Sequence, residues 1–166
     1  MLDDTYSLPA VAQATGANQT TIKSWLHKEV MIGASSIKGG GQRGKPRQFS
    51  LTSVIEIGTA KCILDNGPAD LASAFHAANK FAHTGAGRNP AMPFSEGGTL
   101  LFVAGQRNYI LNYLPGKDYD LVVRQALGDP ESFIRVDMLR VFQRIVEGLG
   151  ISDYREVMAA SYGDTA

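Results

Sequence analysis

This chain of 166 residues is poor in several features that would mark a specialised class of protein. Its one cysteine, Cys62, excludes a disulfide framework and suits a reducing cytoplasm. No apolar stretch approaches the ~20 residues of a membrane span, and the acidic, polar N-terminus does not resemble a signal peptide. Sixteen basic residues balance sixteen acidic ones, which counts against a purely electrostatic nucleic-acid binder. We expect a cytoplasmic protein with no membrane contact.

The sequence also offers few residues for catalysis or metal binding. Its three histidines lack the close pairing, with each other or with Cys62, that common zinc motifs show. The glycine-rich stretch 39–45 has no preceding strand and no Ser or Thr after its Lys, and the stretch 85–90 has no following Lys. Neither stretch therefore satisfies the pattern of a phosphate-binding loop. We expect no enzymatic activity, no cofactor and no metal.

Residues 7–27 have the pattern of two short helices joined by a tight turn. Ser7 is a suitable N-cap, and Pro9 costs little in the first turn of a helix. Gly16 can adopt the left-handed conformation that ends a helix, and Asn18 can cap the helix that follows. The pattern predicts a helix-turn-helix, whose second helix enters the major groove of DNA. An ordinary helical hairpin with solvated polar faces is the alternative.

The second of these helices is expected to have one buried side and one polar side. Ile22 and Trp25 recur at helical spacing and should hold the helix against the core. The residues expected to contact bases or phosphates are Asn18, Gln19, Thr20, Lys23, Ser24 and His27. Asn and Gln can pair bidentately with adenine, and Lys can reach guanine or phosphate.

A basic, glycine-rich segment over residues 35–50 follows the second helix and contains no acidic residue. Ile37 and Phe49 flank it as strand-like ends, so we interpret it as a small β-hairpin wing rather than a flexible linker. Such a wing can lie on the phosphate backbone or in the minor groove. The residues predicted to make these contacts are Lys38, Arg43, Lys45 and Arg47.

Residues 6–67 resemble the winged-helix DNA-binding domain of the mercury-resistance-regulator (MerR) family and its phage relatives. The resemblance lies in a tyrosine-led first helix (Tyr6–Ala12), a second-helix core (Thr21–Trp25), and a wing ending in Arg47–Phe49. It implies DNA binding by the second helix and the wing. The long dimerising helix of standard regulators and a cysteine cluster for sensing metal are missing, so the family's effector chemistry is not carried over.

Helices are predicted over 51–65, ended by Asn-Gly-Pro, and over 69–82. The Gly- and Pro-rich segment 84–98 is expected to be a linker or long loop. The remaining elements are predicted as strands at 99–104, 108–114 and 132–137 and helices at 118–127, 138–149 and 152–160. The fold class is therefore α+β, with a winged helix-turn-helix domain over 1–83 and a small α+β domain over 99–166.

These patterns predict a sequence-specific, nucleoid-associated transcriptional regulator that binds double-stranded DNA as a homodimer. The second domain could serve dimerisation, sensing of a small ligand, or contact with RNA polymerase or a phage-packaging partner. A DNA-packaging subunit of a phage or gene-transfer agent, similar to small terminases, is one alternative function. A protein-interaction adaptor whose winged helix does not bind DNA is another.

Overall fold

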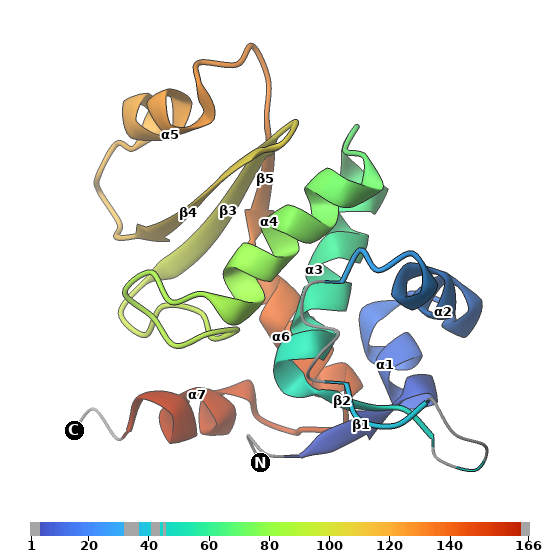
Figure 1. The fold of residues 1–166 in the computed structure, drawn as a ribbon. Coiled ribbons are helices and arrows are strands. Elements are labelled where there is room, and N and C mark those ends of the chain that lie inside the picture. Colours follow the sequence, from blue (N-terminus) through green and yellow to red (C-terminus); the bar gives the residue numbers. More distant parts are fainter. Residues whose placement is uncertain (1–3, 32–36, 41–43, 45, 164–166) are drawn as a thin grey trace.

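A computed structural model of the chain describes residues 4–31, 37–40, 44 and 46–163. These residues form an α+β fold in which a core of helices packs on one face of a small antiparallel sheet and one further helix covers part of the other face (Figure 1). The helices are α1 (Leu8–Thr15), α2 (Gln19–His27), α3 (Leu51–Asn66), α4 (Leu71–His83), α5 (Asp120–Leu127), α6 (Met138–Gly148) and α7 (Tyr154–Tyr162). The strands are β1 (Thr5–Ser7), β2 (Gln48–Ser50), β3 (Gly98–Ala104), β4 (Arg107–Tyr113) and β5 (Ile134–Asp137). The predicted fold class is confirmed.

Helix α3 is the centre of the fold, because its first half is buried on every side. Apolar residues such as Val54, Ile55 and Ile57 therefore point in different directions around the helix, and none of the three is exposed. Ser50 caps α3 by accepting a hydrogen bond from the Ser53 N–H at 3.3 Å. A helix that is apolar all round belongs in a core, and α1, α4 and α6 all pack against α3.

Strands β3, β4 and β5 form one antiparallel sheet in the order β4-β3-β5. Side chains along β3 point alternately to its two faces, so Leu101 and Val103 lie in the main hydrophobic core together with the buried residues of the helices. Leu100 and Phe102 point to the other face, where they meet a second and smaller apolar cluster beneath α5. The three strands expected in the C-terminal half are thus present, each within two residues of its predicted bounds.

Helix α6 joins the C-terminal half of the chain to the predicted helix-turn-helix. Phe142 and Ile145 of α6 are fully buried in the same cluster as Val11 of α1. The two helices approach so closely that a Cβ added at Gly148 would lie 2.7 Å from the Cα of Ala14. The predicted domains over 1–83 and 99–166 therefore share one hydrophobic core.

The predicted loop 84–98 has no regular structure up to residue 97, because Gly98 already belongs to β3, and several side chains hold this loop against the body of the protein. Arg88 is 7% exposed, and its guanidinium lies 4.2 Å from the centre of the Phe81 ring. The Asn89 backbone N–H donates to the Tyr162 hydroxyl at 3.2 Å, which ties the loop to α7. Burial lowers the pKa of Arg88 to about 10, so its guanidinium still carries a charge at neutral pH.

The start of the chain differs from the prediction of a tyrosine-led helix. Tyr6 belongs to β1 and pairs with Phe49 of β2, so the first helix begins at Leu8. Ser7 holds the N-cap position, but its side chain accepts no capping hydrogen bond. Tyr6 is not helical because residues 5–7 are extended as a strand, with Ser7 placed opposite Gln48. The partner strand lies about forty residues further along the chain, beyond the reach of local helix signals.

Candidate nucleic-acid interface

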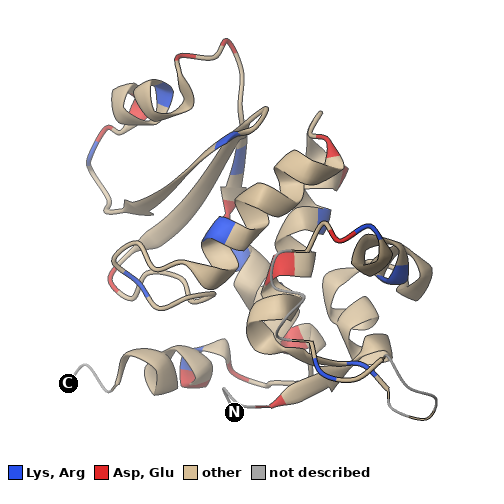
Figure 2. Cartoon of the chain, in the orientation of Figure 1, with Lys and Arg blue, Asp and Glu red and all other residues tan. Residues whose placement is uncertain are grey.

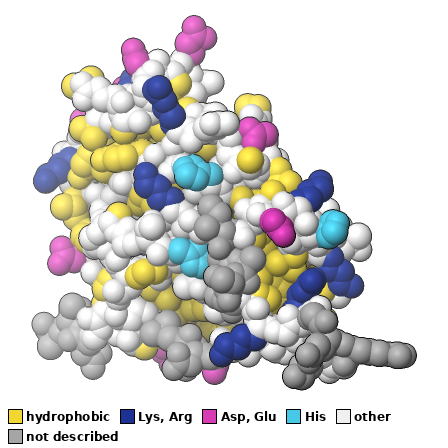
Figure 3. All heavy atoms as spheres, viewed as in Figure 1, with side chains coloured by type: hydrophobic (Ala, Val, Ile, Leu, Met, Phe, Trp, Pro, Cys, Tyr) yellow, Lys and Arg dark blue, Asp and Glu magenta, His cyan; other side chains and the backbone are white. Residues whose placement is uncertain are grey.

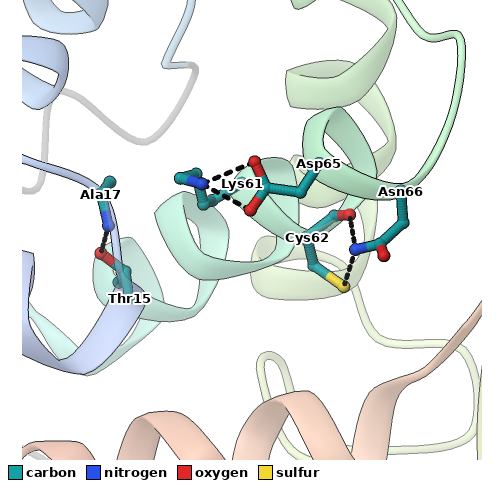
Figure 4. A network of polar contacts seen from close by, with 6 residues as sticks. All are labelled: Thr15, Ala17, Lys61, Cys62, Asp65 and Asn66. Atoms are coloured by element: carbon teal, nitrogen blue, oxygen red, sulfur yellow. Dashed lines mark hydrogen bonds and ion pairs between the residues drawn. The ribbon is translucent and has the colours of Figure 1, made fainter.

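The turn between α1 and α2 is fixed by a small set of local hydrogen bonds. Gly16 has a φ of 73°, in the left-handed region that favours glycine, and its N–H donates to the Ala12 carbonyl at 3.0 Å. The Thr15 hydroxyl donates to the Val11 carbonyl at 2.7 Å. It also accepts from the Ala17 N–H at 3.3 Å, a contact shown in Figure 4. The two predicted helices and the tight turn between them at Gly16 are present.

Two further contacts set the position of α2. The Asn18 side chain accepts a hydrogen bond from the Thr21 N–H at 2.7 Å, as expected of an N-cap. Ile22 is fully buried and Trp25 is 7% exposed, which confirms that these residues face the core. The Trp25 ring meets the Phe75 ring of α4 edge-on, with their centres 5.1 Å apart. Helix α2 is therefore docked on its inner side by large apolar side chains.

The outer side of α2 carries most of the side chains that were predicted to contact DNA. Gln19, Lys23 and His27 are exposed and are spaced by four, so they form one row along the helix. Thr20 is exposed beside this row, whereas Ser24 is half-buried. Figure 1 shows α2 at the edge of the molecule, with α1 on its inner side. The row is thus open to a partner.

Asn18 differs from the rest of this set because its side chain already has a structural partner. Its Oδ1 atom is the capping acceptor, which leaves its amide NH₂ group for contact with another molecule. Asn18 is exposed, so the position is accessible. The bidentate pairing with adenine that its residue type allows would require Oδ1 to leave the cap.

The base of the predicted wing lies within the described residues. Lys38 and Gln48 exchange both backbone hydrogen bonds, at 3.0 and 2.8 Å, which is the pattern of an antiparallel pair. Lys38 is exposed, and the half-buried Arg47 lies with its side-chain stem against the backbone of Gly40. The other two predicted wing contacts, Arg43 and Lys45, lie outside the described residues.

One pairing in this region was not expected from the sequence. The main partner of β2 is β1, with Thr5 placed opposite Ser50, rather than the first arm of the wing. Phe49 of β2 is fully buried in the main hydrophobic core. Strand β2 therefore connects the base of the predicted wing to the helical core.

Charge is distributed unevenly along the neutral chain. Between Thr5 and Ile55 there are six basic residues and one acidic residue, Glu29, which gives this segment a net formal charge of +5. Lys and Arg positions lie on α2 and beside β2 in Figure 2, and dark blue side chains group on that side in Figure 3. The segment that forms the helix-turn-helix and the wing is therefore locally basic on a neutral protein.

Other polar groups in the structure do not form a second site of this kind. Glu56 of α3 is completely buried, and its Oε2 atom lies 2.9 Å from Nε2 of His83 on α4. Sequence reasoning did not find this pair, because the two residues lie 27 positions apart on different helices. Burial raises the pKa of the half-buried Cys62 thiol. Across residues 4–31, 37–40, 44 and 46–163, no three His, Cys, Asp or Glu side chains converge as metal ligands.

No protein-family model matches the sequence, and no curated protein matches it either. Among the described residues, no helix combines the length and the apolar character that crossing a membrane requires. The functional argument therefore rests on the geometry and charge of α2 and the wing.

Proposed function

We propose that this protein binds double-stranded DNA through α2 and the wing, in the manner of a MerR-like winged helix-turn-helix. The observation that carries the proposal is the row Gln19–Lys23–His27 on the outer side of α2, within a segment of net charge +5. Helix α2 has nine residues and is about 14 Å long, a size that fits along the major groove. The polar row reads bases, and Lys38 and Arg47 contact phosphates.

The biological role that fits this interface is transcriptional regulation by a homodimer. A single nine-residue recognition helix covers only a few base pairs, and helix-turn-helix proteins usually join two such half-sites through two-fold symmetry. The mass of the protein in solution tests this part of the proposal. A species of twice 17.8 kDa supports the regulator, whereas a large ring contradicts it and favours a packaging subunit.

The first experiment measures binding to labelled duplexes by fluorescence anisotropy over a series of salt concentrations. Random duplexes give the electrostatic part of the affinity, and a sequence selected from a random pool by the protein gives the specific part. We expect the logarithm of the binding constant to fall linearly with the logarithm of the salt concentration. If binding is absent or insensitive to salt, both DNA-binding functions are excluded and a protein-interaction adaptor remains.

Two substitutions separate base reading from phosphate contact. Gln19→Ala should reduce discrimination at one or two base pairs by about 1–3 kcal/mol and leave binding to random duplexes unchanged. Arg43→Ala combined with Lys45→Ala should weaken binding to all duplexes alike. It should also reduce the slope of the logarithm of the binding constant against the logarithm of the salt concentration by about 2, one for each lost phosphate contact. Arg155→Gln on α7 is the matched control and should change neither quantity. If Gln19→Ala keeps the full base preference, Gln19 does not belong to the recognition surface.

A further inference from the structure

The outer face of the β4-β3-β5 sheet carries an apolar cluster that the DNA interface does not use. Leu100 and Phe102 of β3 and Leu111 of β4 are each less than 9% exposed on this face. Helix α5 covers part of the face with Val123 and Leu127 (Figure 1). The strands also face the main core on their other side, so this cluster is a separate apolar compartment.

A cavity of about 390 Å³ opens between this face and the segment that leads into α5. Its size lies within the range of about 300–1,000 Å³ that is typical of small-molecule sites. Aromatic rings form much of its wall. Phe133 meets Phe102 edge-on with the ring centres 5.6 Å apart, and Tyr119 meets Tyr113 in the same way at 5.8 Å. Rings held in this manner present faces and edges to a flat apolar ligand.

The cavity is lined by more positively charged than negatively charged side chains. Lys117 and Arg135 both line it, and no ion pair involves either of them within the described part of the chain. The acidic lining residue, Asp120, is already paired, because its Oδ2 atom lies 2.9 Å from Nε of Arg124. Arg135 of β5 stands opposite Phe102 in the sheet register, so its guanidinium shares the outer face with the aromatic rings. The rim is thus cationic beside an apolar floor.

We propose that this cavity binds a small aromatic anion. The ring of the ligand packs against Phe133, at the end of the cavity where Phe102 pairs with Arg135, above the apolar floor. Its carboxylate accepts hydrogen bonds from the Arg135 guanidinium, whose planar fork matches a carboxylate, and Lys117 adds a second positive charge. This site does not depend on the proposed binding of DNA, and it is tested on the protein alone.

The test uses 2-naphthoate as the anionic probe and 2-naphthamide as its neutral counterpart, with binding measured by calorimetry. Amide chemical shifts, which are tractable for a 17.8 kDa chain, locate the bound probe. We expect saturable binding of 2-naphthoate with shifts centred on β3, β5 and the segment before α5. Arg135→Gln should weaken 2-naphthoate by about tenfold, the equivalent of one charge-assisted hydrogen bond, without weakening 2-naphthamide.

Two further variants separate a specific site from non-specific apolar binding. Phe133→Leu keeps the apolar character of the wall but removes a ring, and it should weaken both probes. Arg155→Gln removes one positive charge from α7, which lies across the molecule from α5 (Figure 1), and should weaken neither. The proposal is overturned if 2-naphthoate does not saturate, if its shifts centre on another part of the chain, or if Arg135→Gln leaves its affinity unchanged.

Discussion

Replacement of Phe75 by Leu tests whether a single aromatic contact docks α2 on the core. Phe75 is 1% exposed and meets Trp25 edge-on at 5.1 Å. Leucine fills less of the space and loses the aromatic pair, so we expect the free energy of unfolding to fall by about 1–3 kcal/mol. For a chain of this length a loss of 2 kcal/mol corresponds to a Tm that is about 4–8 °C lower.

Trp25 is the only tryptophan of the chain and therefore reports on this contact directly. In Phe75→Leu we expect its fluorescence emission to move to longer wavelength, because the gap beside the indole ring becomes more accessible to water. Phe81→Leu is the matched control, since Phe81 is also buried on α4 but packs against Arg88. It should lower the Tm without moving the emission. Equal emission shifts in the two variants would refute the role assigned to Phe75.

Three other changes have defined outcomes. Asn18→Ala should lower stability in urea denaturation by about 1 kcal/mol through loss of the α2 cap, and Asn18→Asp, which keeps an acceptor, should not. Hydrogen bonds from Ser73, the backbone N–H foremost, hold the pKa of Asp70 below its ordinary 3.8. The ionised Asp70 therefore contributes fully to the free energy of unfolding above pH 3.8, and this contribution is lost as the pH falls through the lower pKa of the folded state. Asp70→Asn should make the free energy of unfolding depend less on pH in this acidic range. Gly148→Ala should lower the free energy of unfolding in urea by about 1–3 kcal/mol, because it forces a methyl group against the Ala14 backbone. An unchanged urea midpoint would show that α6 can move away from α1.

Elements that depend on local signals could be predicted from the sequence. The turn at Gly16 and the cap at Asn18 are specified by residues within one helical turn, and both have the expected geometry. The apolar run of β3 and the strong amphipathic pattern of α6 gave the correct element types for the same reason. The residues that face outward on α2 followed from the spacing of Ile22 and Trp25.

Contacts between distant parts of the chain could not be predicted in this way. Nothing near Tyr6 indicates that it pairs with Phe49, and the first residues were therefore expected to be helical. The close approach of Gly148 to Ala14 depends on the packing of α6 across α1, which no periodicity reveals. The buried pair of Glu56 and His83 has the same origin, because each residue taken alone fits a solvated helix face.

The zero net charge of the whole chain says little about the charge that a bound phosphate would meet, because only nearby charges act on it. At physiological ionic strength a charge is screened over about 8 Å, so a bound phosphate senses only the charges near the surface it touches. Most of the acidic residues lie after Ile55, and the segment from Thr5 to Ile55 retains its charge of +5. The salt dependence of DNA binding should therefore follow the number of Lys and Arg contacts on α2 and the wing rather than the charge of the whole protein. Neutrality excludes a protein that is basic all over, but it does not argue against a local basic interface.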